Sequence, residues 1–454
     1  MIPGKHDAWF LPLGGTGEIG MNLNLYGHDG RWLMVDCGIT FSQGRDSVTH
    51  VQMPDPEFII AHQERLCGLI VTHAHEDHVG AIAHLWKKFN CPIYTTAFTA
   101  EILRRKLADA GLADTASINI VEPQARIQLD VFNIEWISLT HSTPETQGLL
   151  IRTPVANIFH TADWKLDPDP VVGPAYPESK LKSLAQQNIT AMVCDSTNAT
   201  EEGSSISEGD LRPGLLDIIE KAPGKVVIAC FGSNVARLQT IASVAHEAGR
   251  YPCLLGRSLN NFHSAAVAAS IWNSEYKFTD PKDINYLSAN EILIIATGSQ
   301  GEPRAALDRL SKGNHSITRL TNKDTVVFSS RVIPGNEESI AALVRRLDKI
   351  GVTIIEDNSL NTPIHASGHP PKEELKKLYD WVQPKIAIPV HGEPQHLRAN
   401  AEIAKNQGIS HQMVGLNGDL YMLAPKIDIK RGAVFTGRLG LNKQALVKLS
   451  KEAY

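Results

Sequence analysis

Residues 73–78 read His-Ala-His-Glu-Asp-His and follow directly after the short apolar run Leu69-Ile70-Val71. Four potential metal ligands therefore lie within six positions, at the end of an expected buried strand. Side chains two positions apart in an extended chain point the same way, so His73 and His75 should face one side together. This stretch indicates a metal site built at a strand end.

Asp77 and His78 lie where the chain enters the periodic stretch 79–89, which predicts a helix. Two ligand pairs at a strand-to-helix corner favour two adjacent cations, one for each pair. The alternative is a run of histidines that only caps a helix. The spacing H-x-H-x-D-H favours the metal site, because chance seldom places it at a strand end.

Further ligands are expected after other strands, because two cations need more than four. His141, Asp163 and His391 each follow an apolar run, and strand ends are where α/β proteins usually build sites. A carboxylate such as Asp163 can bridge two cations about 3.5–4 Å apart. Asp36 follows the apolar run 32–35 and is a natural acceptor for a ligand imidazole or a bound water.

The composition is that of a globular protein, with 454 residues of which 43% are hydrophobic and 20% charged. No apolar stretch reaches the ~18 residues of a membrane span, and the N-terminus lacks a signal-peptide profile. The six cysteines are scattered without a Cys-x-x-Cys pair, which predicts reduced thiols in a cytoplasmic protein with no membrane association. The net charge of −5 excludes a global basic field, so a nucleic acid would need a local groove or the metals.

The pattern of the chain changes twice and divides it into three parts. Residues 1–205 alternate short apolar runs with polar loops, and residues 362–454 return to that pattern. Residues 206–361 alternate strand-like and helix-like segments, which predicts a parallel sheet flanked by helices. We expect one α/β domain that a second domain interrupts and the C-terminal part completes. The expected strands of the second domain are 226–229, 253–255, 292–296, 326–329 and 353–356, and its expected helices are 211–221, 236–248, 265–272 and 337–349.

A glycine-rich stretch at 15–20 fits G-x-G-x-x-G, and Asp36 lies where a dinucleotide-binding fingerprint would place an acidic residue. That fingerprint needs a helix after the glycines to bind a pyrophosphate. Residues 21–26 instead alternate like a strand. We therefore interpret the stretch as a hairpin at the edge of the metal site.

These residues resemble the metallo-β-lactamase superfamily, whose leading motifs are matched in order by Asp36, residues 73–78, His141 and Asp163. The long insertion and three later motifs resemble those of the β-CASP nucleases within it; the motifs contain Asp195, His369 and His391. Finer matches resemble the ribonuclease J family: Leu-Gly-Gly-x-Gly-Glu-Ile-Gly at 13–20, Asp-Ser-Thr-Asn-Ala at 195–199, Thr-Gly-Ser-Gln-Gly-Glu-Pro at 297–303, Ile-Pro-Gly-Asn-Glu at 333–337 and His-Ala-Ser-Gly-His at 365–369.

The resemblance implies a metallo-β-lactamase αββα sandwich, interrupted by a β-CASP domain whose parallel sheet is flanked by helices. It implies hydrolysis of RNA phosphodiesters, by a 5′-to-3′ exonuclease and/or an endonuclease of RNA processing and decay. Two divalent cations per chain are implied, Zn²⁺ by the histidine-rich donor set and Mn²⁺ as the alternative. One would be bound by His73, His75, His141 and Asp163, and the other by Asp77, His78, Asp163 and His391.

The same resemblance names Asp77, His369 and Asp195 as catalytic residues. His369 would stabilise charge on the phosphoryl group or protonate the leaving oxygen, since imidazole titrates near neutral pH. Asp195 would orient His369 or a ligand histidine.

Four residues are candidates for binding a substrate phosphate. Ser233 and Asn234 precede an expected helix whose N-terminal amides could hold a phosphate, and His365 and Ser367 lie near His369 in the sequence. A 5′ monophosphate would favour trimming from that end. The alternative for Ser233 and Asn234 is ordinary helix capping.

The C-terminal tail carries six basic residues, and a solvated helix face is the expected structure rather than a set of RNA contacts: Lys430, Arg431, Arg438, Lys443, Lys448 and Lys451. The separate C-terminal domain typical of ribonuclease J is expected to be missing. A homodimer or larger homo-oligomer is still expected.

Two other functions compete with RNA hydrolysis. The first is a metallo-hydrolase of the same fold that acts on DNA or on a small ester or thioester; a small substrate would not require the long insertion. The second is a non-catalytic RNA-binding subunit, and the presence of every expected ligand argues against it.

Overall fold

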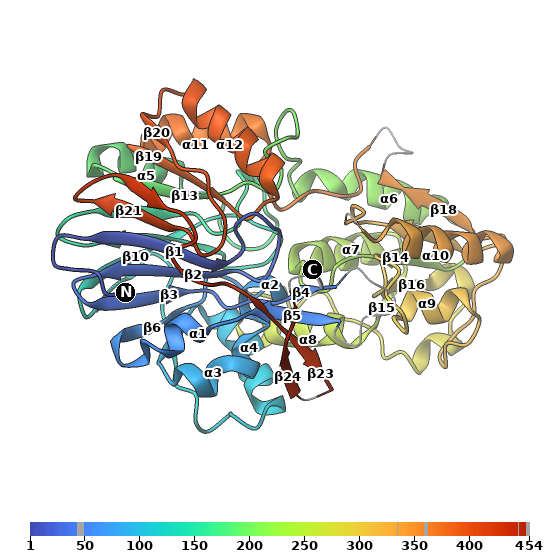
Figure 1. Cartoon of the computed structure of the whole chain (residues 1–454). Helices are drawn as coiled ribbons and strands as arrows, with labels where there is room; N and C mark the ends of the chain where they lie inside the picture. The colour runs from blue at the N-terminus through green and yellow to red at the C-terminus, as the bar shows by residue number, and fades with distance from the viewer. Residues whose placement is uncertain (43–49, 334, 358–361, 444, 451–454) are drawn as a thin grey trace.

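The computed structural model describes residues 1–42, 50–333, 335–357, 362–443 and 445–450 (Figure 1). These residues form two lobes, a larger one around two packed sheets and a smaller one around a single parallel sheet. The chain runs from the larger lobe into the smaller and then returns, so the first strands and the strands β21 and β22 belong to the same lobe (Figure 1).

Two sheets pack face to face in the larger lobe, where Phe10 and Leu33 of one sheet share a buried core with Ile134 and Ile388 of the other. The first sheet contains β1 (Ala8–Gly14), β2 (Leu23–His28), β3 (Arg31–Val35), β6 (Leu66–Ile70), β7 (Ile93–Thr95), β8 (Ile118–Ile120), β21 (Leu420–Ala424) and β22 (Asp428–Lys430), in the order β22-β21-β1-β2-β3-β6-β7-β8. The second contains β9 (Arg126–Leu129), β10 (Phe132–Ser138), β11 (Gln147–Arg152), β12 (Asn157–His160), β13 (Ala191–Asp195), β19 (Ile386–Val390) and β20 (His411–Gln412), in the order β20-β19-β13-β12-β11-β10-β9.

Helices cover the outer faces of this sandwich. Leu85 shares a buried cluster with Leu25 of the first sheet, and Leu378 shares one with Phe159 of the second. The helices on the first sheet are α1 (Glu57–Ile60), α3 (Ile82–Phe89) and α4 (Ala97–Asp109), and those on the second are α5 (Glu178–Ser183), α11 (Lys372–Val382) and α12 (Pro394–Asn406). This arrangement confirms the predicted αββα sandwich.

The smaller lobe is built on a parallel sheet with the order β15-β16-β14-β17-β18. Its strands are β14 (Val226–Ala229), β15 (Tyr251–Leu255), β16 (Ile292–Ala296), β17 (Thr325–Phe328) and β18 (Thr353–Glu356). One face is covered by α6 (Arg212–Lys221), α7 (Val235–Glu247) and α8 (Arg257–Ala268), and the other by α9 (Ala306–Ser311) and α10 (Glu337–Ile350). This is the predicted parallel sheet flanked by helices.

Most predicted elements of the smaller lobe lie within two residues of the observed bounds, but α8 does not. The sequence predicted a helix over 265–272, whereas α8 spans Arg257–Ala268. Its first two turns are mainly polar, so local periodicity did not reveal them. Burial of Leu259 and Phe262 in the apolar cluster of the lobe stabilises these turns.

The insertion separates two strands that are direct neighbours in the fold. β13 and β19 pair in parallel, with Ala191 opposite Ile386 and Asp195 opposite Val390. The part of the chain that follows the insertion completes both sheets, because β19 and β20 extend the second sheet while β21 and β22 extend the first. The larger lobe therefore requires both ends of the chain.

The helix predicted over 79–89 is two helices. α2 (Glu76–Val79) comes first, and α3 begins at Ile82 after a short break. The carbonyl oxygens of Glu76 and His78 accept hydrogen bonds from Ile39 N (3.0 Å) and Cys37 N (2.8 Å). These contacts tie α2 to the loop after β3 and set its direction apart from that of α3.

The expected helix in the C-terminal tail is wrong, because the tail forms strands. β23 (Arg438–Asn442) and β24 (Ala445–Lys448) join β4 (Thr40–Phe41) and β5 (Val51–Pro54) in an antiparallel sheet. Three tail charges form ion pairs with other parts of the larger lobe: Arg431 pairs with Asp419, Arg438 with Glu18, and Lys448 with Asp55 and Glu57. Lys451 lies outside the described residues.

In the described parts of the chain, no helix combines the length and the apolar character needed to cross a membrane. All six cysteines are free, and five of them are buried.

Candidate active site

The side chains singled out as metal ligands meet at one end of the sandwich, where the central strands finish. The contributing segments are the loop after β6 and the short helix α2, followed by the loops after β10, β12 and β19; the ligands are His73, His75, Asp77, His78, His141, Asp163 and His391. Strand ends thus gather residues that are more than 300 positions apart in the sequence.

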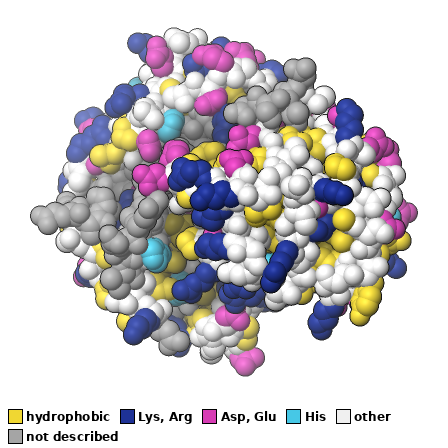
Figure 2. All heavy atoms as spheres, turned by 90° about the vertical axis from the view of Figure 1, so that its right-hand side faces the viewer, with side chains coloured by type: hydrophobic (Ala, Val, Ile, Leu, Met, Phe, Trp, Pro, Cys, Tyr) yellow, Lys and Arg dark blue, Asp and Glu magenta, His cyan; other side chains and the backbone are white. Residues whose placement is uncertain are grey.

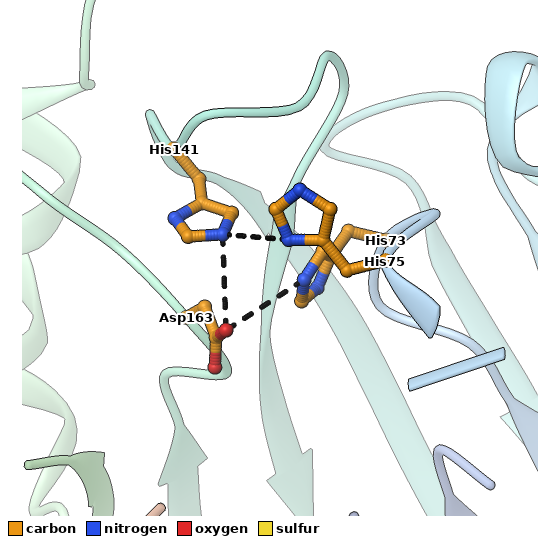
Figure 3. Close-up of side chains that lie close together, drawn as sticks. All are labelled: His73, His75, His141 and Asp163. Carbon is orange, nitrogen blue, oxygen red and sulfur yellow. Dashed lines mark hydrogen bonds and ion pairs between the residues drawn. The ribbon is translucent and has the colours of Figure 1, made fainter. Parts of the chain in front are cut away.

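His73, His75, His141 and Asp163 form a first group, whose ligand atoms all lie within 4.8 Å of one another (Figure 3). His141 Nε2 is 3.0 Å from His75 Nδ1 and 3.7 Å from Asp163 Oδ2. His73 Nε2 is 3.8 Å from the same carboxylate oxygen. Three imidazoles and one carboxylate around a common centre form a donor set that suits zinc.

Asp77, His78, Asp163 and His391 form a second group of the same compactness. His78 Nε2 lies 3.3 Å from Asp163 Oδ2 and 3.5 Å from Asp77 Oδ2. His391 lies 3.1 Å from Asp77 through Nε2 and 3.0 Å from Asp163 through Nδ1. Asp163 belongs to both groups, as a bridging carboxylate would.

The hydrogen bonds around the two groups direct nitrogen lone pairs at their centres. His141 Nδ1 donates to the carbonyl oxygen of Gly368 (2.6 Å), and His78 Nδ1 donates to Asp36 Oδ2 (2.7 Å). A carbonyl or carboxylate only accepts, so in the neutral form of each ring Nδ1 carries the hydrogen and Nε2 keeps its lone pair. His73 Nε2 is buried and has no hydrogen-bond partner among the described residues. These residues therefore fit divalent cations, with the surrounding acceptors that such ligands normally have.

The site is electrostatically divided. Burial lowers the pKa of His73 and His141 well below its usual value, and neighbouring imidazoles lower it further. Burial acts in the same direction on His78 and His391, but the carboxylate of Asp163 outweighs it and raises their pKa well above the usual range. The first group therefore offers neutral imidazoles, and the second attracts positive charge.

Asp36 anchors the ligand loop as well as one ligand. Besides His78, it accepts hydrogen bonds from Thr72 N (2.8 Å) and Thr72 Oγ1 (2.9 Å). Thr72 Oγ1 also lies 3.0 Å from His73 Nδ1, and Asn22 Nδ2 lies 3.1 Å from His78 Nε2. Sequence reasoning missed Thr72 and Asn22; the only signal was the position of Thr72 directly before the cluster.

Asp195 and His369 lie beside the second group. His369 Nδ1 is 2.7 Å from Asp195 Oδ2, while Asp195 Oδ1 is 3.6 Å from His391 Nδ1. The ring centre of His369 is 5.0 Å from that of His141 and 5.7 Å from that of His391. Burial lowers the pKa of His369, but Asp195 outweighs it, so that the net pKa is raised. The geometry thus allows Asp195 to orient both histidines.

Of the two residues before α7 that were considered for phosphate binding, Ser233 lines a cavity and Asn234 caps the helix. Ser233 lines a cavity of about 200 Å³ that also contacts His75 and lies between the lobes. Asn234 caps α7: its side chain accepts from Arg237 N (2.9 Å) and donates to Glu208 Oε1 (2.9 Å). The structure thus gives Asn234 the capping role that the sequence left as its alternative.

His365 and Ser367 lie on the segment that leads to His369. Ser367 Oγ accepts from Asn198 Nδ2 at 2.8 Å, and His365 Nδ1 lies 3.5 Å from Arg237 Nη1. Both residues are partly exposed, as is His369.

The glycine-rich stretch at 15–20 is the predicted hairpin, since it connects the antiparallel strands β1 and β2. The carbonyl oxygen of Gly15 accepts from His391 N at 2.6 Å, and that of Glu18 accepts from Gly392 N at 3.0 Å. The stretch therefore borders the second ligand group rather than a nucleotide.

Three family profiles match successive parts of the chain. The Metallo-beta-lactamase superfamily matches residues 20–185, the beta-CASP domain of Ribonuclease J matches 223–347, and the Zn-dependent metallo-hydrolase RNA specificity domain matches 361–414. A crystal structure of a protein of unknown function from Enterococcus faecalis aligns with a TM-score of 0.63 and 14% identity, over 92% of this chain and 100% of that one, which supports the fold alone. Fold and site together define a metallo-hydrolase of the β-CASP type.

Curated relatives narrow this class. The chain is 41% identical over 421 residues to the Ribonuclease J of Sinorhizobium meliloti, covering 92% of this chain and 74% of the relative. It is 36% identical to that of Mycolicibacterium smegmatis (94% and 76% covered) and 31% identical to that of Thermus thermophilus (97% and 78% covered). The chain belongs to the ribonuclease J family.

Proposed function

We propose that this chain is a metal-dependent ribonuclease, which hydrolyses RNA phosphodiesters as a 5′-to-3′ exonuclease and/or an endonuclease. The observation that carries this proposal is the pair of four-ligand groups that share Asp163, with His369 beside them. Membership of the ribonuclease J family supports RNA as the substrate.

Two divalent cations per chain fit the two groups, and the nitrogen-rich first group favours Zn²⁺, with Mn²⁺ as the alternative. Bound there, they would act as Lewis acids and lower the pKa of a water molecule towards ~7. His73, His75, His141 and Asp163 would hold one cation, and Asp77, His78, Asp163 and His391 the other.

The other residues of the site would act on the phosphate. His369 keeps Nδ1 on Asp195, at 2.7 Å, which leaves Nε2 free to face the scissile group. A protonated His369 would stabilise negative charge on the phosphoryl oxygens and could pass its proton to the leaving oxygen. Asp195 fixes the orientation of the ring and favours its charged form.

A substrate phosphate is proposed to bind to Ser233, His365 and Ser367. These residues would select RNA that carries a 5′ monophosphate. Ser233 borders the inter-lobe cavity, and Ser367 lies two positions before His369. Replacing Ser233 and Ser367 by Ala should erase any preference for monophosphate over hydroxyl 5′ ends, measured as relative decay rates of end-labelled RNAs. An unchanged preference would rule out this pocket.

Basic side chains are available to attract RNA although the net charge is −5. Figure 2 shows Lys and Arg side chains gathered near the middle of the face that includes the smaller lobe. Exposed basic residues of that lobe include Arg304, Arg309, Arg319 and Arg345. A local positive surface is enough to raise the concentration of a polyanion near the site.

We also propose the domain division 1–205, 206–361 and 362–454, a homodimer or larger homo-oligomer, and a reducing, cytoplasmic compartment. The separate sheet formed by β14–β18 supports the division, and the six free cysteines support the compartment. Light scattering after gel filtration would measure the oligomeric state, and a monomer at micromolar concentration would contradict it.

RNA cleavage after removal and return of metal tests the function. Purified protein is chelated, supplied with Zn²⁺ or Mn²⁺, and incubated with RNA labelled at a 5′ monophosphate, triphosphate or hydroxyl end. We expect cleavage only with metal, and a loss of at least 10²-fold for the double variant Asp77→Ala, His78→Ala with its fold retained by circular dichroism.

His84→Ala is the matched control, because this exposed histidine lies near the cluster in sequence yet outside both ligand groups. Labelled DNA and a generic ester serve as competing substrates. Turnover of the ester without cleavage of RNA would contradict the proposal, as would full RNA cleavage by the double variant.

A further inference from the structure

Four buried charges form a network at the junction of the lobes, outside the ligand groups. Lys165 and Asp167 follow Asp163 closely, Glu208 precedes α6, and Arg237 lies in the first turn of α7. Their side chains are at most 1% exposed; Lys165 Nζ is 2.7 Å from Asp167 Oδ2, and Arg237 Nη2 is 2.9 Å from Glu208 Oε1. Asp167 Oδ2 also accepts from Glu208 N at 3.0 Å, which joins the two pairs. Buried charges are costly unless fully partnered, so this network holds one geometry.

Arg237 uses every nitrogen of its guanidinium. Nε and Nη2 donate to the two oxygens of Glu208 at 3.0 and 2.9 Å. Nη1 donates to the carbonyl oxygen and the hydroxyl of Ser329 at 3.0 and 2.6 Å, and lies 3.5 Å from His365 Nδ1. Ser329 Oγ in turn donates to Ile364 O at 2.6 Å. Arg237 therefore lies against the ring of His365 and, through Ser329, holds the backbone before it.

The contact with Arg237 decides which nitrogen of His365 carries hydrogen. Both hydrogens of Arg237 Nη1 go to Ser329, and a hydrogen on His365 Nδ1 would point at this positive group only 3.5 Å away. The neutral ring therefore carries its hydrogen on Nε2. Burial, followed by the positive charge of Arg237, lowers the pKa of His365 to about 3. His365 is therefore a neutral ring that offers a single donor, Nε2–H, throughout the ordinary pH range.

The segment around His365 borders the active site, because the carbonyl oxygen of Gly368 accepts from His141 Nδ1 at 2.6 Å. His365, Ser367 and His369 are partly exposed, and the residues between them are buried. Partly exposed and buried side chains thus alternate along the segment up to His369, which lies beside the ligand groups. Asp357 Oδ1 fixes the start of the segment, because it accepts from His365 N at 3.2 Å.

We propose that Arg237 is a positioning residue for the RNA: it fixes His365 as a neutral Nε2–H donor to a substrate phosphate. Through Glu208 and Asp167 it also ties that donor to the loop that carries Asp163. This inference rests on the proposed ribonuclease activity and names a residue, in the smaller lobe, that touches neither metal nor substrate.

Replacement of Arg237 by Lys tests the role, because lysine keeps the charge but not the planar fork. We expect Kd for RNA and KM to rise about tenfold, with kcat changed much less, since a ground-state phosphate contact is lost. Arg250→Lys is the control: Arg250 is also buried in the smaller lobe, but its Nη1 and Nη2 donate to backbone carbonyl oxygens of Gly224 and Ala222. Equal changes in Kd and KM for both variants would overturn the proposal.

A second pair of variants tests the donor itself without disturbing the buried network. Gln at position 365 can place an amide N–H near the position of Nε2, whereas Asn reaches only the position of Nδ1. His365→Gln should stay within about threefold of the wild-type Kd, and His365→Asn should weaken binding about tenfold. These two variants test the role of His365 even if Arg237→Lys does not fold. Equal RNA binding by His365→Gln and His365→Asn would overturn the proposal.

Failure of this inference is distinguishable from failure of the function. Wild-type protein is first assayed for metal-dependent cleavage of RNA, and Kd is measured separately by fluorescence anisotropy on chelated protein. Absence of cleavage by the wild type would refute the ribonuclease activity. Cleavage by the wild type, with no selective effect at positions 237 and 365, would refute only the role of Arg237.

Discussion

At the scale of single residues, the site depends on which nitrogen of each imidazole faces inward. Asp36 accepts a hydrogen bond from Nδ1 of His78, and the carbonyl oxygen of Gly368 accepts one from Nδ1 of His141. In the neutral ring, each of these hydrogen bonds leaves the lone pair on Nε2, the nitrogen that faces the ligand group. Metal affinity should therefore be sensitive to residues that do not themselves bind metal.

Replacing Asp36 by Asn should lower metal affinity about 10–100-fold, because the amide is a weaker acceptor for His78 and removes a buried negative charge. Competition with a chromophoric chelator measures this affinity. Asp130→Asn is the control, since that carboxylate is 41% exposed and pairs with Arg31 at the surface. Unchanged affinity in Asp36→Asn would refute this dependence.

Single-residue chemistry was also what the sequence revealed best. His73 and Asp77 stand in a dense local pattern at a strand end, and such a pattern needs no knowledge of distant contacts. Thr72, Asn22 and Arg237 act through neighbours brought together only by the fold, and their residue types are common in ordinary loops and helices. Their roles could not be predicted from spacing.

At the scale of elements, α2 is too short to be stable alone, since one turn does not offset the cost of nucleation. Backbone hydrogen bonds from the loop after β3 compensate, because Cys37 N and Ile39 N donate to its carbonyl oxygens. Gly38 permits this approach: a Cβ there would lie 1.7 Å from Asp77 O. The ligands Asp77 and His78 thus depend on a loop distant in sequence.

Gly38→Ala should force α2 away from this loop, because its nearest neighbours are backbone atoms that cannot move singly. We expect a loss of about 1–3 kcal/mol or more in unfolding free energy, together with a lower metal content. Urea denaturation and elemental analysis measure the two effects. Gly4→Ala should be nearly neutral, since its Cβ would meet only the Asp7 carboxylate at 3.3 Å. Equal stabilities of both variants would contradict this account.

Glu135 joins three elements far from the active site. It pairs with Arg126 of β9 (2.9 Å), Arg152 of β11 (2.5 Å) and Lys180 of α5. Burial raises the pKa of Glu135, but the hydrogen bonds from these cations outweigh it and lower the pKa to about 2.

The stabilisation from Glu135 should therefore be complete above its unfolded pKa of about 4.3 and should be lost as the pH falls towards about 2. We expect Glu135→Gln to cost about 1–3 kcal/mol at pH 7 and progressively less below pH ~4. Denaturation curves of both proteins at several pH values measure this difference. A constant difference from pH 7 to pH 3 would contradict it.

The tail shows where element prediction failed. Basic residues spread over 426–451 suggested a solvated helix, but the short Leu-Gly-Leu run of β23 pairs with β5, and Lys448 reaches Asp55. Pairing with a strand nearly 400 positions earlier is a tertiary contact. Periodicity within the tail carries no trace of it.

At the scale of the whole molecule, the two lobes share a single apolar cluster. Ala74, which lies between two metal ligands, is fully buried in this cluster. Its neighbours there include Phe98 and Ile102 of α4. The cluster also contains Phe262 of α8 and Ile364, which lies after the insertion. The smaller lobe therefore packs directly behind the ligand loop. The parallel sheet was predictable from local patterns and the sandwich from the family resemblance. The shared core was not predictable, since it joins segments that look complete by themselves.

The shared cluster should make the lobes unfold together, so calorimetry of the wild type should show one cooperative transition. Phe262→Ala should lower the unfolding free energy by about 3–5 kcal/mol and shift that whole transition. Two separate transitions, of which only one responds to the substitution, would show that the lobes are independent.

The central claim is that two cations, held by His and Asp side chains from distant parts of the chain, are required for RNA cleavage. Metal content of fully active protein, measured by elemental analysis and located by anomalous scattering, tests it most directly. We expect two divalent cations per chain, one in each ligand group that shares Asp163. Full RNA cleavage by protein with fewer than two cations at these groups would contradict the account.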